Sequence, residues 1–230
     1  MSLAVFKAEK LLTDKITRFL GEEKTAALLC LTDAFDKILP DSVLWTNQNE
    51  NGELTGVFAC GNKRVLSFSN EIAVEIPFSA ERVITDRKTA DCILDKKYLM
   101  SIDATPSESA KGAPPELFPV ITELSGSKTP AEIRLCHHYK GLCEGALIDE
   151  STPKACGYIC FFEDFAVICD VFTLPEYRNQ GHGSKLVKKL LNLSQGKRVY
   201  LLCGENRVSF YEKIGFKTAL ILYEYENKGA

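Results

Sequence analysis

The chain has 230 residues, of which 45% are hydrophobic and 26% are charged, and its formal net charge is −3. This length suits one large domain or two small ones. No apolar run reaches the roughly 18 residues that a membrane span needs, and no lysine and arginine cluster is large enough to indicate a nucleic-acid-binding face. We therefore expect neither a membrane nor a nucleic acid as a partner.

Nine cysteines are present, and none forms a Cys-x-x-Cys pair. Several lie inside strand-like runs, where a free cysteine behaves as a small hydrophobic residue. No secretory signal is visible near the N-terminus. These features predict reduced thiols in a cytoplasmic protein rather than a disulfide framework.

The N-terminal part begins with helical periodicity over residues 4–37, which Gly21 interrupts and Pro40 ends. Three strands joined by Asn- and Gly-containing turns are predicted next, so we expect a meander. These strands cover Ser42–Asn47, Glu53–Cys60 and Arg64–Ser69. A partial apolar stripe over residues 79–94 predicts a further helix.

Proline becomes frequent between Asp103 and Pro130, together with serine and glycine. A stretch of this composition is poor in regular structure. We therefore predict three parts: an N-terminal α/β sub-domain at 1–105, a Pro-rich linker at 106–130 and a second domain at 131–230.

The second domain opens with another three-strand pattern. Its strands are predicted at Leu142–Ile148, Ala155–Phe162 and Phe165–Thr173. After these strands we predict, in order, a helix to about Leu193, a strand from Lys197, a short helix from Val208 and a final strand to Tyr225. The order predicts an α/β protein with a mixed, mostly antiparallel sheet flanked by helices. The N-terminal part, which also contains a meander, is either a degenerate copy of this fold or a separate α/β arrangement.

The most informative stretch is the turn between the strand that ends at Thr173 and the following helix. It reads Arg178-Asn-Gln-Gly181-His-Gly183-Ser184. A glycine-bearing loop that enters a helix directs free backbone N–H groups and the positive end of the helix dipole outward, which suits a phosphate or pyrophosphate. The spacing matches neither a Walker A sequence nor the Gly-x-Gly-x-x-Gly dinucleotide fingerprint.

A second signature follows the loop. After a strand, Asn206 stands five residues before Tyr211, and the short helix ends in Gly215-Phe216. With the Arg-x-x-Gly-x-Gly loop upstream, this order and spacing resembles the GCN5-related N-acetyltransferases (GNAT superfamily). The resemblance covers the second domain only.

The resemblance implies acetyl-CoA as the co-substrate. Its pyrophosphate would bind the loop, with Arg178 adding charge. The backbone N–H groups expected to hold it belong to Asn179, Gln180, Gly181, His182, Gly183 and Ser184. Asn206 would hydrogen-bond to the pantetheine arm, and it would also suit a helix N-cap.

The resemblance also implies the catalytic groups. Val171, near the end of the strand before the loop, would use its N–H as an oxyanion-type donor to the acetyl carbonyl, with Thr173 beside it on the cofactor. Tyr211 would protonate the departing thiolate. Lys185, Lys188 and Lys189 are expected to form a solvated helix face.

The general base departs from the family pattern. Many members place a glutamate on the strand before the loop, but Val167 and Cys169 occupy those positions here. The only carboxylate inside that strand is Asp170, which we take as the candidate catalytic base. Glu144, Glu163 and an ordered water chain are the alternatives.

No metal site is predicted. Cys136, His137, His138 and Cys143 resemble a metal cluster by composition, but their spacing matches no trusted zinc pattern. In the N-terminal part, Ser69-Asn70-Glu71 follows the third strand without a glycine loop. We therefore expect that this part does not bind CoA and instead forms one wall of the acceptor pocket.

The sequence thus predicts an acetyl-CoA-dependent N-acetyltransferase that acts on a primary amine of a small molecule or peptide by direct attack. One alternative is a catalytically inactive CoA-binding sensor or regulatory module, which the missing glutamate favours and Tyr211 disfavours. A second is a phosphate- or nucleotide-binding module of another fold. The acceptor and the oligomeric state are not predicted.

Overall fold

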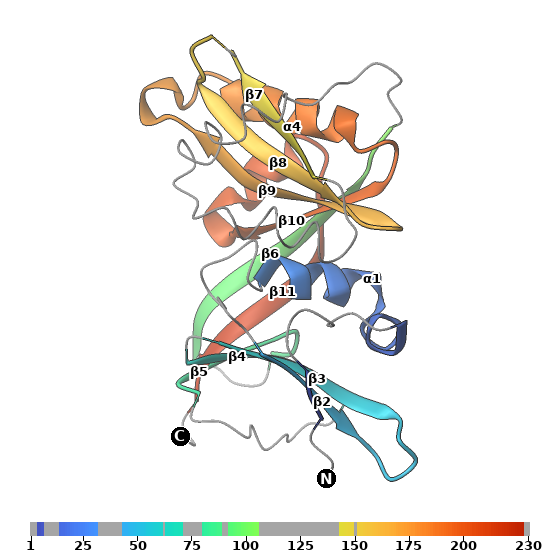
Figure 1. The fold of residues 1–230 in the computed structure, drawn as a ribbon. Coiled ribbons are helices and arrows are strands. Elements are labelled where there is room, and N and C mark those ends of the chain that lie inside the picture. Colours follow the sequence, from blue (N-terminus) through green and yellow to red (C-terminus); the bar gives the residue numbers. More distant parts are fainter. Residues whose placement is uncertain are drawn as a thin grey trace. The chain divides into compact units, whose positions relative to one another are not determined.

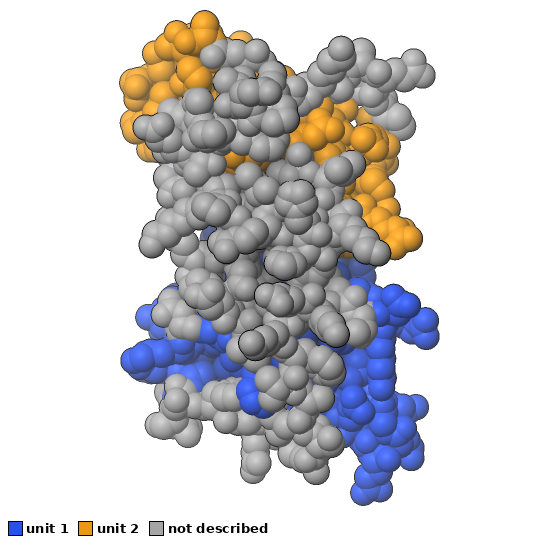
Figure 2. All heavy atoms as spheres, viewed as in Figure 1, with its two compact units in different colours: residues 1–99, 202–208, 218–230 blue, residues 100–201, 209–217 orange. Residues whose placement is uncertain are grey.

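Strands dominate the computed structural model of the chain (Figure 1). The structure describes residues 4–6, 14–31, 43–61, 63–70, 80–88, 92–105, 143–149 and 151–227. The chain divides into two compact units, which Figure 2 colours separately: residues 1–99, 202–208 and 218–230, and residues 100–201 and 209–217. The Pro-rich linker lies outside the described residues, and the three predicted domain ranges stay a prediction.

The first unit contains a sheet with the strand order β1-β2-β3-β4-β5-β11. Its strands are β1 (Ala4–Phe6), β2 (Val43–Gln48), β3 (Leu54–Gly61), β4 (Arg64–Ser69), β5 (Arg82–Thr85) and β11 (Lys217–Glu226). Strands β4 and β5 are parallel, whereas β1 and β2, β2 and β3, β3 and β4, and β5 and β11 pair antiparallel. The sheet is therefore mixed and mostly antiparallel.

The predicted meander is confirmed as β2-β3-β4. The turn between β2 and β3 is held by Asn49, whose side-chain oxygen accepts the N–H groups of Asn51 at 3.0 Å and Glu53 at 2.9 Å. Gly52 adopts a φ of 77° there, a left-handed conformation that glycine enters without steric cost. Local turn chemistry thus sets the register of this hairpin.

Two predicted helical segments are wrong in part. Residues 4–6 form strand β1, which pairs with Leu44–Thr46 of β2. Within the predicted helix at 79–94, residues 82–85 form β5, and a long strand, β6 (Ile93–Asp103), begins at its end. The β-branched residues of β5 lie between two strands, parallel to β4 and antiparallel to β11, and this pairing overrides the partial helical stripe.

Helix α1 (Asp14–Leu31) covers β3 and β4 of the first unit. Gly21 has φ 72° and ψ 175°, so the helix is kinked there, as the sequence pattern predicted. The residues after the kink, from Thr25 to Leu31, are all buried. The helix therefore supplies much of the core of this unit.

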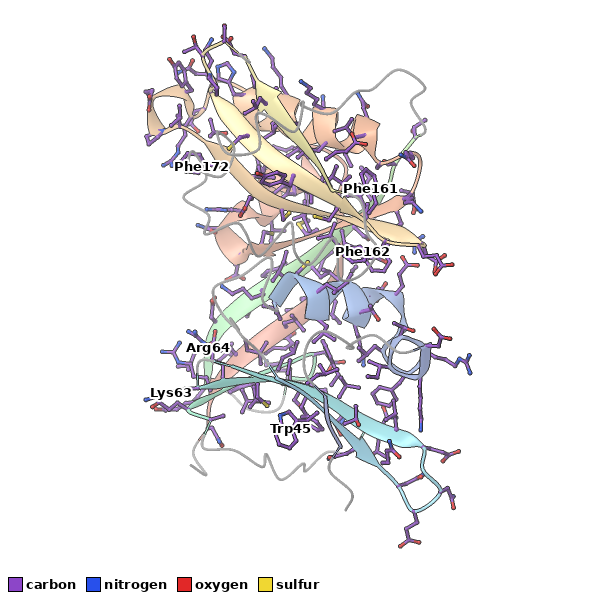
Figure 3. All side chains as sticks on the ribbon, in the orientation of Figure 1. Trp45, Lys63, Arg64, Phe161, Phe162 and Phe172 are labelled. Carbon is purple, nitrogen blue, oxygen red and sulfur yellow. The ribbon has the colours of Figure 1, made fainter. Side chains whose placement is uncertain are left out.

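Strand β11 carries a buried acidic residue into the first unit. Glu224 is 4% exposed, and its Oε1 accepts Nε of Arg64 at 3.0 Å and a terminal nitrogen of Arg82 at 3.2 Å. Figure 3 labels Arg64 at the start of β4. Because a buried carboxylate needs charged partners, this network ties the last strand of the chain to β4 and β5.

The second unit contains a sheet with the order β10-β9-β8-β7. Its elements match the predicted strands and helices of the C-terminal half. They are β7 (Cys143–Ile148), β8 (Ala155–Phe161), β9 (Phe165–Thr173), η3 (Pro175–Tyr177), α4 (His182–Leu193), β10 (Arg198–Gly204) and α5 (Val208–Glu212). The turn η4 (Glu205–Arg207), the last residues of β10 and Val208 belong to the first unit.

Helix α4 packs on β7, β8 and β9 through its apolar face (Figure 1). That face buries Leu186, Val187, Leu190 and Leu193. Every residue of β8 is buried, so the sheet has apolar partners along its length. The sheet and α4 hold the loop before α4 in place.

The two halves of the chain share one strand plan. In each, a three-stranded antiparallel meander is followed by a fourth strand parallel to the third, β5 beside β4 and β10 beside β9. The whole chain is therefore an α/β protein in which the N-terminal half repeats the strand plan of the C-terminal half.

Candidate functional site

Strand β9 has a bulge close to its C-terminal end. Cys169 pairs with Tyr158 and Phe172 pairs with Cys156, so Asp170 and Val171 together face the single residue Gly157. Asp170 has a φ of 52°, a left-handed value that is uncommon for a residue with a side chain. Bulges re-aim side chains beside active sites, and strained residues persist there when the surroundings over-determine them.

The Asp170 side chain is half-buried. Its Oδ2 is buried, and no hydrogen-bond partner for it is found among the described residues. Nearby, burial and, to a lesser extent, the Asp170 charge raise the pKa of the Cys156 thiol to about 12. A buried carboxylate oxygen without a donor costs stability, so it is a candidate for a functional role.

Strands β9 and β10 pair over a short distance only. Their parallel register runs from Phe165 beside Arg198 to Val167 beside Tyr200. Within the described part of the chain, no pairing with β10 is found for β9 after Val167. On the edge of β9 that faces β10, the backbone N–H and C=O groups near Val171 and Thr173 therefore make no hydrogen bonds in the β9–β10 pairing.

The loop after β9 is pinned at its start. The Nε of Arg178 donates to the carbonyl of Thr173 at 3.2 Å, and its guanidinium lies 5.9 Å from the ring centroid of Phe172. Figure 3 labels Phe172 on β9. Arg178 is exposed, and this bond uses its Nε, so its terminal nitrogens are left for a ligand.

The N-terminus of α4 is open. Gly181 is the N-cap residue with φ 81° and ψ 0°, and no side chain caps the helix. The first helical bond runs from the N–H of Lys185 to the carbonyl of Gly181 at 3.0 Å. The N–H groups from Gly181 to Ser184 thus have no partner inside the helix, and with the helix dipole they form an anion-binding arrangement.

Gly183 lies where three elements of the second unit meet. A Cβ atom built on it would be 3.3 Å from Oγ1 of Thr173 and 3.4 Å from the Phe210 ring. The end of β9, the first turn of α4 and α5 therefore converge at this position. Phe210, which directly precedes Tyr211, was not among the predicted site residues.

Helix α5 holds Tyr211 in an aromatic cluster. Tyr211 is 5% exposed and makes edge contacts with Phe210 and Phe216, at centroid distances of 4.9 and 5.8 Å. Gly215, with φ 114°, ends the segment, and a Cβ there would be 3.3 Å from Ile102. Packing on two sides fixes the Tyr211 ring, which a proton donor needs.

Asn206 and His182 have local environments of their own. Asn206 is exposed in the middle of η4, where Gly204 is the N-cap, so it does not cap that turn. Its Oδ1 lies 3.3 Å from the position of a Cβ on Gly204. The His182 ring contacts Tyr177 edge-on at 5.9 Å, and its Nδ1 is buried with no hydrogen-bond partner found among the described residues.

The remaining candidates lie away from this convergence or outside the described residues. Glu144 is half-buried on β7 opposite Ile159, and Glu163 is exposed in the turn between β8 and β9. Cys136, His137 and His138 fall outside the described residues. In the described ranges, no group of three or more His, Cys, Asp or Glu side chains is arranged to hold a metal ion.

Comparison with known proteins connects this geometry to a family. The model of the acetyltransferase (GNAT) domain matches residues 144–218. Among solved structures, a GCN5-related N-acetyltransferase from Sphaerobacter thermophilus is 12% identical with a TM-score of 0.57, over 97% of this chain and 95% of that chain. A tandem GNAT protein from the clavulanic acid biosynthesis pathway is 11% identical with a TM-score of 0.50, over 98% of each chain. A comparison with curated proteins found no match.

The domain match covers β7 to α5, which include the bulge, the loop and Tyr211. The two solved structures share the fold over nearly the entire chain. The C-terminal half therefore contains a GNAT acetyltransferase domain, and nearly the whole chain has the fold of these two GNAT structures. None of the helices in the described part of the chain is both long and apolar enough to cross a bilayer.

Proposed function

We propose that this protein transfers an acetyl group from acetyl-CoA to a primary amine of a small molecule or peptide by direct attack. The observation that carries the proposal is the convergence of the bulged end of β9, the open N-terminus of α4 and the helix that carries Tyr211, which meet at Gly183. GNAT proteins generally use acetyl-CoA, so the domain match supports this donor.

The open end of α4 fits the pyrophosphate of the donor. The N–H groups of residues 179–184 would donate to its oxygens, and the unused nitrogens of Arg178 would add charge-assisted bonds. The absence of side chains at Gly181 and Gly183 leaves the backbone accessible to the anion. Asn206, which is exposed on η4, would hydrogen-bond to the pantetheine arm.

The chemical step forms one bond and breaks one. The amine lone pair attacks the thioester carbonyl carbon, a C–N bond forms, and the C–S bond breaks as CoA leaves. Negative charge on the carbonyl oxygen would be stabilised by the N–H of Val171, on the part of β9 that β10 does not pair. Thr173 would contact the cofactor beside it.

Two proton transfers complete the reaction. Asp170 would accept the proton that the attacking nitrogen loses, since one of its carboxylate oxygens is buried and has no donor found among the described residues. Tyr211 would donate a proton to the departing thiolate sulfur. The products are an N-acetyl amine and free CoA, and no metal takes part in these steps.

The inactive CoA-binding module is the second candidate, because Val167 and Cys169 occupy the family's glutamate positions and both are buried. We also propose a cytoplasmic location, because the enzyme and the CoA-binding module would both use CoA from inside the cell. The two candidates differ in turnover and agree in binding.

The test therefore has two stages. Acetyl-CoA should raise the melting temperature and bind in a calorimetric titration, because it stabilises the folded state by mass action. No response at millimolar acetyl-CoA would refute both candidates. Release of free CoA thiol with a panel of amines then separates them: turnover supports the enzyme, and binding without turnover over the panel supports the regulatory module.

A further inference from the structure

A polar cluster connects β6 to η4, the turn that carries Asn206. The hydroxyl of Tyr98 donates to Oε1 of Glu205 at 2.8 Å, and Nζ of Lys96 lies 3.5 Å from the same oxygen. Lys96 and Tyr98 are two residues apart on β6 and so point to the same face of the strand. All of these residues belong to the first unit.

The donor in this cluster is held more firmly than the acceptor. Tyr98 is half-buried, whereas the Glu205 side chain is 67% exposed and would be free to rotate without its partners. The hydrogen bond to Glu205 is the main cause that raises the pKa of Tyr98, so the phenol is the proton donor at neutral pH. A bond from a neutral hydroxyl to a carboxylate is stronger than a neutral pair.

The turn itself has few other constraints. No side chain caps η4 at its N-cap, Gly204. The three residues Glu205, Asn206 and Arg207 are all exposed. Within the described residues, the bond from Tyr98 and the ion pair from Lys96 are thus the side-chain contacts that tie this short turn to a neighbouring strand.

Asn206 directly follows the tethered residue. Its Oδ1 lies close to the backbone at Gly204, on the other side of Glu205 in the chain. A shift of the Glu205 backbone therefore moves the Asn206 amide, because a three-residue 3₁₀ turn has little independent freedom.

We propose that Tyr98 is a positioning residue: through Glu205 it holds η4 so that the Asn206 amide is presented to the pantetheine arm of acyl-CoA. This inference rests on the proposed function.

The first test compares Tyr98→Phe with Tyr223→Phe. Tyr223 is also a half-buried tyrosine, on β11, and no hydrogen bond of its hydroxyl is found among the described residues. Tyr98→Phe should weaken acetyl-CoA binding about three- to tenfold, as expected for an exposed charge-assisted hydrogen bond, while Tyr223→Phe should not. The melting temperatures of both apo proteins should stay close to that of the wild type.

A double-mutant cycle separates positioning from a general structural effect. If Tyr98 acts through Asn206, the loss of affinity caused by Tyr98→Phe should vanish in an Asn206→Ala background. Glu205→Gln, which still accepts from the tyrosine hydroxyl, should keep most of the affinity, whereas Glu205→Ala should match Tyr98→Phe.

Hydrogen–deuterium exchange supplies a readout that needs no ligand. Tyr98→Phe should speed exchange at residues 205–208 of the apo protein, and Tyr223→Phe should not. Unchanged exchange, or unchanged affinity in a wild type that binds acetyl-CoA, overturns the inference alone. A wild type that does not bind acetyl-CoA overturns the proposed function and the role of Tyr98 in donor binding with it.

Discussion

Gly183 offers the sharpest test of the anion site, because three substitutions there separate bulk from charge. A Cβ at this position meets Oγ1 of Thr173 at 3.3 Å and the Phe210 ring at 3.4 Å. A single methyl group fits if these neighbours yield by a few tenths of an ångström, whereas longer side chains must turn toward the open helix terminus. Gly183→Ala, Gly183→Gln and Gly183→Glu therefore form a graded series.

The expected magnitudes follow from this geometry. Gly183→Ala gains up to ~1 kcal/mol of helix propensity, which the tight contacts offset, so stability and affinity should change little. Gln and Glu add nearly equal bulk, but only Glu adds charge. At about 5 Å from a doubly charged pyrophosphate, a carboxylate is repelled by about 1.7 kcal/mol at a dielectric constant of 80 and about 7 kcal/mol at 20. Gly183→Glu should therefore bind acetyl-CoA at least about tenfold more weakly than Gly183→Gln.

Calorimetric titration of acetyl-CoA into the three variants and the wild type measures this difference, and the melting temperature of each apo protein serves as a folding control. The difference between Glu and Gln should shrink as salt is raised, because the charges become screened. Equal affinity of the Glu and Gln variants in low salt would show that the pyrophosphate does not lie at the N-terminus of α4.

Three further outcomes are expected. Tyr211→Phe should lower kcat about 10- to 1,000-fold with little change in acetyl-CoA affinity, because the ring is retained and only the proton donor is lost; an unchanged kcat would assign the proton to another group. Glu224→Ala should lower the melting temperature by about 4–12 °C, from a loss of ~2–3 kcal/mol that is discounted because Arg64 and Arg82 are 24% and 47% exposed; a loss no greater than that of an exposed ion pair would contradict the network. The hydrogen bond from the Lys154 ammonium lowers the pKa of the Asp149 carboxyl to about 2. The stabilisation that this carboxylate provides is therefore present above pH ~4 and is lost as the pH falls toward 2. In Asp149→Asn, the free energy of unfolding measured with urea should depend less on pH over that range. An unchanged pH dependence would exclude this carboxyl as its cause.

Local signals in the sequence were sufficient for most of the C-terminal half. The strand that ends at Thr173, the glycine loop and α4 occur in the predicted order because β-branched runs, glycine turns and helical stripes each act within a few residues. The same holds for the meander in the N-terminal half, where Asn49 closes its turn through its own side chain. The domain match from residue 144 to 218 covers the segment that carries both quoted motifs.

The tertiary structure decided what depends on residues far apart in the chain. Residues 82–85 form a strand because β4 and the last strand, β11, lie on either side of them, and a local stripe of apolar residues cannot report that pairing. The backbone is left-handed at Asp170, where two residues of β9 face the single residue Gly157 of β8, and this bulge is defined only by the pairing of the two strands. The contact of Tyr98 with Glu205 joins residues 107 positions apart. These strand pairings and the Tyr98–Glu205 hydrogen bond depend on how the complete sheet is assembled. Local sequence patterns therefore could not predict them, and the tertiary structure was needed.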